Sequence, residues 1–179
     1  MYYVDMPSAD EIGNLNLVRS DACVSIYLPT TPISRETEQS RTNLGNLVKK
    51  AVAQLEAAGL DKKSIASMQE QFNDLLNDED FWNHQANSLA ILATPDSLRT
   101  YRMASKLSDI VEVSDRFHLK PLLRAITFPH AAHILALSEK SVRLIKVSAD
   151  LPASEISVQN MPTDAATAGG KAVNKDYTG

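Results

Sequence analysis

The sequence predicts an α/β protein in which a mixed β-sheet is covered by a helical hairpin and is followed by the opening strands of a second α/β domain. Three observations support this prediction. Apolar segments with strand-like alternation occur at residues 22–28 and 88–94. Between them lies a long stretch whose apolar side chains recur three and four positions apart, the spacing of amphipathic helices. Further strand-like segments follow residue 128 without a helix to cover them.

The helical hairpin is expected between the first two strands. The first strand ends at the Pro29-Thr30-Thr31-Pro32 turn, and a long helix is predicted over residues 34–58. Gly59 is placed to end this helix in a left-handed conformation, and Asp61 can cap the next one. The predicted core-facing stripes comprise Leu44, Leu47, Val48, Ala51, Val52 and Leu55 in the first helix and Ile65, Met68, Phe72, Leu75 and Leu76 in the second.

The remaining elements of the first domain follow from local patterns. A short helix is expected at residues 7–17, before the first strand. Residues 88–94 predict a central strand, and the following Pro-Asp-Ser turn should return the chain as a second strand at residues 98–103. A strand at residues 110–113 and a helix at residues 119–126, with a proline in its first turn, complete the domain.

A second domain is expected to begin near residue 129. Three strands are predicted at residues 131–137, 142–147 and 154–158, and loop composition dominates from Asn160 onward. Strands must bury their apolar faces, so these either extend the first sheet or belong to an incomplete domain. We predict an N-terminal α/β domain at residues 1–128, and these two alternatives stay open for residues 129–179.

Composition excludes several classes of protein. Hydrophobic residues make up 44% of the 179 residues, so a packed core is expected rather than disorder. Cys23 is the only cysteine, which excludes an internal disulfide, and its apolar surroundings predict a buried thiol. Neither a secretion signal nor the roughly 20 consecutive apolar residues of a spanning helix is visible. A cytoplasmic location without a membrane partner is predicted.

The charge pattern leaves two interpretations open. The net charge of −4 argues mildly against nucleic-acid binding, which depends on phosphate contacts. Cations nevertheless gather at residues 99–124, and acids at residues 70–80. The two regions are either solvated faces of opposite sign or include a phosphate-contacting face. The predicted RNA-binding residues are Arg99, Arg102, Arg116 and Lys120, and such a face requires them to be exposed on one side of the fold.

Motifs for other chemistry are missing from the sequence. It holds no phosphate-binding glycine loop, dinucleotide fingerprint or nucleophile elbow. His130 and His133 are three residues apart at a loop-to-strand junction rather than on a helix. Three apart on a strand places them on opposite faces, and a zinc site also needs a third protein ligand. We therefore predict no metal and no cofactor. His118 is interpreted as a structural histidine rather than a phosphate contact, and Trp82 as a core anchor rather than a base-stacking platform.

Four blocks carry a resemblance to a known family. They are Val24 to Thr30, Phe81 to Pro95 with the sequence FWNHQANSLAILATP, Asp115 to Leu123, and Ile134 to Leu144. In this order they resemble the bacterial family related to archaeo-eukaryotic peptide-chain release factors. The resemblance implies an N-terminal domain at residues 1–128, followed at residues 129–179 by the start of a middle domain. That domain would be incomplete here, which would make the chain a fragment of a longer protein. It also implies a role in translation or ribosome rescue, with the ribosome or tRNA as partner.

The resemblance also points to one candidate catalytic segment. In the related release factors a strand hairpin precedes an exposed Gly-Gly-Gln loop, which promotes hydrolysis of the peptidyl-tRNA ester. Gly169, Gly170 and Lys171 occupy the corresponding place here. Paired glycines allow close backbone approach, and a backbone N–H can stabilise an oxyanion. Lys171 replaces the glutamine and cannot accept a hydrogen bond from water, so the segment is either a remnant of that loop or a plain linker.

Two functions therefore stay open. One is a translation-associated factor with RNA contacts and ester hydrolysis. The other is a binding or scaffold domain that keeps the fold without the chemistry, because a fold does not determine a function.

Overall fold

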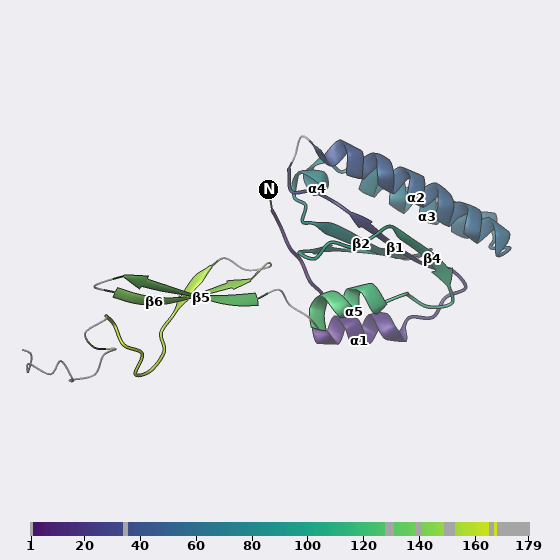
Figure 1. Cartoon of the computed structure of the whole chain (residues 1–179). Helices are drawn as coiled ribbons and strands as arrows, with labels where there is room; N and C mark the ends of the chain where they lie inside the picture. Colours follow the sequence, from purple (N-terminus) through teal and green to yellow (C-terminus); the bar gives the residue numbers. More distant parts are fainter. Residues whose placement is uncertain are drawn as a thin grey trace, which may run out of the picture. The chain divides into compact units, whose positions relative to one another are not determined.

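A computed structural model describes residues 2–33, 36–127, 131–138, 141–148, 153–164 and 167. The chain divides into two compact units, Met1–Phe128 and Pro129–Gly179, called here the first and second unit. Each is described by itself, and both are drawn in Figure 1. Within the described ranges, no helix combines the length and the apolar character needed to cross a membrane.

The first unit is built on a four-stranded sheet. Its strands are β1 (Cys23–Pro29), β2 (Ser88–Thr94), β3 (Ser97–Met103) and β4 (Ile110–Ser114). They lie in the order β3-β2-β1-β4, so β1 and β2 are central. Thr94 and Ser97 pair at the turn between β2 and β3, which confirms the predicted hairpin.

The α/β class and the helical cover are confirmed, but the expectation of a mixed sheet is not met. All three strand pairings of this sheet are antiparallel. The connection from β1 to β2 explains the difference. It contains two long antiparallel helices, α2 (Thr37–Ala57) and α3 (Lys62–Asn77), so the chain crosses the sheet twice before it enters β2. A single crossover helix would have produced a parallel pair.

The turn between α2 and α3 follows the local signals in the sequence. Gly59 adopts the left-handed conformation, with φ of 78°, just after α2 ends. Asp61 caps α3, because its carboxylate accepts hydrogen bonds from the backbone N–H groups of Lys63 and Ser64, both at 3.0 Å. Gly59 and Asp61 thus allow the chain to reverse direction between the end of α2 and the start of α3.

Both faces of this sheet are covered by helices. Figure 1 shows α2 and α3 on one face and α1 (Ala9–Leu17) and α5 (Lys120–Thr127) on the other. Side chains alternate along each strand, so β1 sends Val24 and Ile26 into the core under α2 and α3. It sends Cys23 and Tyr27 into the second core, under α1 and α5. The buried thiol predicted for Cys23 is found there.

A short helix that was not predicted from the sequence contributes to the core under α2 and α3. This helix, α4 (Glu79–Asn83), begins where the Asp78 carboxylate accepts a hydrogen bond from the Phe81 backbone at 2.9 Å. Trp82 is buried, and its indole N–H donates to the Leu75 carbonyl at 3.0 Å. Trp82 is therefore a core anchor, as predicted.

The second unit contains a three-stranded antiparallel sheet in the order β5-β6-β7. Its strands are β5 (Ala131–Ser138), β6 (Ser141–Ser148) and β7 (Ser154–Ile156). Large apolar side chains of β5 are exposed: Ile134 to 50%, Leu135 to 53% and Leu137 to 69%. Successive residues of a strand point to opposite faces, so both faces of this sheet carry exposed apolar groups.

Candidate functional site

The segment joining β4 to α5 carries Arg116, and α5 begins at Lys120; both are predicted RNA contacts. Phe117 and Leu119 alternate with them and are buried in the core under α1 and α5. The burial of Phe117 and Leu119 anchors this segment in the core. Arg116 and Lys120 are exposed and His118 is half-buried.

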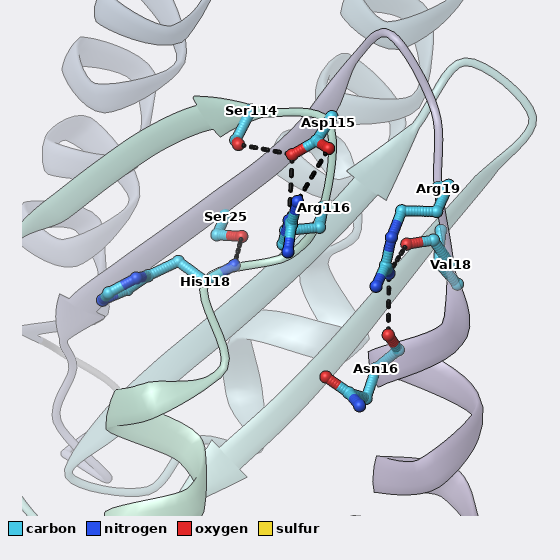
Figure 2. Close-up of polar contacts among 8 residues, drawn as sticks. All are labelled: Asn16, Val18, Arg19, Ser25, Ser114, Asp115, Arg116 and His118. Carbon is cyan, nitrogen blue, oxygen red and sulfur yellow. Dashed lines mark hydrogen bonds and ion pairs between the residues drawn. The ribbon is translucent and has the colours of Figure 1, made fainter.

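Arg116 forms a two-point ion pair with its neighbour Asp115 (Figure 2). Nε and one terminal nitrogen of the guanidinium each lie 3.0 Å from a carboxylate oxygen. Arg116, followed by Ser114, lowers the pKa of the Asp115 carboxyl, and the same contact raises the pKa of Arg116. Both side chains are largely exposed, so an incoming phosphate could compete for the guanidinium.

His118 is held by its backbone. Its N–H donates to Ser25 Oγ at 2.9 Å, which Figure 2 shows, and its carbonyl accepts from the Tyr27 hydroxyl at 2.6 Å. Burial raises the pKa of Tyr27, so this hydroxyl stays protonated and continues to donate. The His118 ring lies edge-on to Tyr27, with ring centroids 6.5 Å apart. These contacts support the predicted structural role of His118 and leave its ring at the surface.

Arg19 is an exposed cation that the sequence analysis missed. One terminal nitrogen donates to the carbonyls of Asn16 at 2.8 Å and Val18 at 2.7 Å, where α1 ends (Figure 2). The neighbouring Ser20 backbone N–H donates to the Asp115 carbonyl at 3.1 Å, which holds the end of α1 beside the Arg116 segment. An arginine just beyond a predicted helix was the available signal, because such residues often bind the last helical carbonyls.

Arg99 and Arg102 do not share a face of the sheet. Arg99 pairs with Leu92, whose side chain belongs to the core under α1 and α5. Arg102 pairs with Leu89, which belongs to the core under α2 and α3. Directly paired residues of an antiparallel sheet lie on the same side, so the two arginines lie on opposite sides. Their odd spacing along one strand was the signal that could have revealed this from the sequence.

Arg102 also departs from the expected exposure, because only 9% of its surface is accessible. Its guanidinium donates to Asp5 Oδ2 at 2.7 Å and lies over the rings of Phe81, at 4.1 Å, and Tyr3, at 5.2 Å. The Arg102 backbone N–H donates to the other Asp5 oxygen. Arg102 therefore binds the N-terminal segment to β3 through Asp5, and its guanidinium is not available to a phosphate backbone.

Arg99 remains exposed on the α1 side of the sheet. Its charge reaches Glu11 of α1, whose pKa is lowered chiefly by hydrogen bonds with Ser8 and to a smaller degree by Arg99. Arg99, on the α1 side of the sheet, and Lys120, at the start of α5, are both exposed, and so is Arg116 in the segment that precedes α5. Whether they bind RNA stays a prediction.

The candidate catalytic residues Gly169, Gly170 and Lys171 lie outside the described residues, and so does His130. His133 is exposed on β5. Across the described ranges, no group of three or more histidine, cysteine, aspartate or glutamate side chains is arranged to hold a metal ion.

Comparison with known families bears on the second unit. Residues 129–179 match the model of bacterial archaeo-eukaryotic release factor family 11. The second unit is release-factor-like. The predicted resemblance is thereby confirmed for a segment that contains the Ile134 to Leu144 block, whereas the other three blocks lie outside the match.

A solved structure described as an archaeal protein is similar, with a TM-score of 0.48 and 12% sequence identity. The similarity covers 84% of this chain and 45% of that one, so the chain spans less than half of that structure. No curated protein matches the chain.

Proposed function

We propose that this release-factor-like protein associates with the ribosome or tRNA in the cytoplasm and acts on the ester bond of peptidyl-tRNA. The observation that carries the proposal is the family match, because residues 129–179 include Gly169, Gly170 and Lys171. The proposed chemistry requires no metal and no cofactor.

The first unit would supply the RNA contacts. Arg99, Arg116 and Lys120 are exposed, and phosphate contacts by such side chains supply most of the affinity of RNA-binding proteins. Arg102 is excluded from this set because its charge is paired with Asp5. The overall charge of −4 means that attraction to RNA must come from local groups rather than from the net charge.

The terminal segment would supply the chemistry. Water adds to the ester carbonyl, the bond to the tRNA ribose oxygen breaks, and the products are a peptide carboxylate and a free tRNA hydroxyl. Gly169 and Gly170 allow the backbone to approach the ester, and the Lys171 N–H can donate to the oxyanion that forms. The Lys171 side chain cannot accept a proton from the attacking water while it is charged.

The inability of a charged Lys171 side chain to accept a proton favours a second candidate, a binding or scaffold domain without hydrolytic activity. Such a protein would still contact the ribosome through the first unit. Lys171, in place of the glutamine of the related release factors, is the specific observation that supports it.

Ribosome association tests the binding part of the proposal. Co-sedimentation of the protein with ribosomes should weaken, and its salt dependence should flatten, when Arg99→Glu and Lys120→Glu are combined. The charge-matched control combines Lys62→Glu and Lys63→Glu, which alters two exposed lysines at the start of α3, on the opposite helical layer. Equal co-sedimentation of the wild type and the Arg99/Lys120 variant would remove this surface as the RNA contact.

Release of peptide from peptidyl-tRNA on purified ribosomes tests the catalytic part. Gly170→Ala should abolish release because its methyl group obstructs backbone approach, whereas Lys171→Gln should preserve or raise it. If neither the wild type nor Lys171→Gln releases peptide while both co-sediment with ribosomes, the binding domain is the correct alternative.

A further inference from the structure

The α2–α3 hairpin carries a surface hollow over part of its length. A depression of about 460 Å³ lies between the two helices. The α2 residues that line it are Gly45, Val48, Lys49, Val52, Ala53 and Glu56. Their spacing of three and four residues makes them one continuous face of the helix. Asn73 and Leu76 belong to the α3 wall.

The base of this hollow is apolar, and some of the residues that line it are small. Val52 and Leu76 are only partly buried, although both pack against the core beneath. A methyl group placed on Gly45 would meet no atom within 4 Å, and Ala53 is exposed. Small side chains let another helix approach closely, and a groove between two helices is a common seat for a third helix.

The charges beside the hollow are arranged symmetrically. Lys49 stands three residues before Val52, and Glu56 stands three residues after Ala53. Both are exposed, and neither makes an ion pair with another described residue of the chain. A second α2 helix that ran in the opposite direction, centred on Val52 and Ala53, would place its Glu56 opposite Lys49 and its Lys49 opposite Glu56. The face is therefore complementary in charge to a reversed copy of itself.

We propose that this chain forms a two-fold symmetric dimer in which α2 of each copy packs in the α2–α3 hollow of the other. Symmetric dimers use the same patch on both subunits, which must be self-complementary, and this face meets that condition. The 21 residues of α2 make a rod about 31 Å long at 1.5 Å per residue, enough to span the hollow and both charge pairs. The four central helices would shield Val52 and Leu76 from water.

Sedimentation equilibrium of the intact chain tests the dimer. The wild type should associate reversibly as its concentration rises. Lys49→Glu alone, or Glu56→Lys alone, places like charges opposite each other twice and should raise the dimer dissociation constant at least about tenfold. Lys50→Glu is the matched control, because Lys50 is exposed on α2 but does not line the hollow, and it should leave the constant unchanged.

The proposed symmetry allows a sharper experiment. A mixture of the Lys49→Glu and Glu56→Lys variants should form a heterodimer, because one then carries only acids and the other only bases at the paired positions. Combining both substitutions in one chain should restore the homodimer. Trp82 fluorescence verifies that each variant is folded. The proposal is overturned if the wild type stays monomeric, if the single variants associate as the wild type does, or if the mixed variants do not associate.

Discussion

Strands β2 and β5 share the tripeptide Ile-Leu-Ala but differ completely in burial. In β2 it occupies residues 91–93, where all three side chains are buried. In β5 it occupies residues 134–136, where Ile134 and Leu135 are about half exposed. The two strands have almost the same apolar content, so composition alone does not account for the difference.

The difference lies in what surrounds each strand. β2 is bonded to β1 and β3, and helices cover both faces of its sheet. Among the described strands, β5 pairs only with β6. The described residues of the second unit include no helix that covers this sheet. Strand propensity therefore measures fit to a pleated surface, whereas burial depends on the covering layers.

The largest test of this comparison places a charge among the apolar side chains of each unit, beginning with the core that covers β2. Leu47→Asp introduces an unpaired carboxylate into the core between α2 and the sheet, where Leu47 is 2% exposed. We expect it to lower the free energy of unfolding of the first unit by several kcal/mol. Urea unfolding followed by the fluorescence of Trp82, the only tryptophan, measures this transition.

The matched substitution in the second unit is Leu137→Asp. Leu137 is 69% exposed, so the new carboxylate stays in water and should change amide hydrogen exchange in β5 and β6 only slightly. A severe loss of amide protection in β5 and β6 would break the comparison, because it would mean that something covers β5.

A smaller effect is expected at two glycines in the helical layers. Gly59→Ala should destabilise the first unit by roughly 1–2 kcal/mol, because a side chain strains the left-handed turn that returns α3 over the sheet. Gly13→Ala, in the middle of α1, should stabilise it by roughly 0.5–1 kcal/mol. Space around Gly13 is open, so the methyl group meets no obstacle. The same urea measurement distinguishes the two, and an unchanged or raised stability of Gly59→Ala would contradict the assignment of Gly59 as a left-handed stop.

The smallest effect is a pH dependence at the start of α3. Hydrogen bonds from Ser64, and then from Lys63, lower the pKa of Asp61 below its usual value of 3.8. A carboxyl whose pKa falls on folding contributes stability at pH values above its unfolded pKa, and loses it as the pH falls through the folded value. The stability difference between wild type and Asp61→Asn should therefore shrink as the pH is lowered through and below 3.8. A difference that does not change with pH would show that the Asp61 charge does not contribute.

The candidate site was only partly predictable. The exposure of Arg99, Arg116 and Lys120 follows from the simple expectation that charged side chains stay in water. Arg102 failed that expectation because Asp5, 97 positions away in the chain, supplies a partner that allows its burial. Arg19 escaped notice because its role depends on the exact end of α1. Gly169, Gly170 and Lys171 lie outside the described residues, so their role stays a prediction.

By itself, the sequence determined where most of the helices and strands form; the short helix α4 is the exception. Gly59 and Asp61 end one helix and start the next through backbone conformation and a hydrogen bond to a residue two or three positions away, and such effects are local. Only the tertiary structure decided that the first sheet is antiparallel, that Arg102 lies on the opposite side from Arg99, and that β2 is covered while β5 is not. Those outcomes depend on contacts between residues far apart in the chain, and the alternation of side chains along a strand is the same whichever layer covers it.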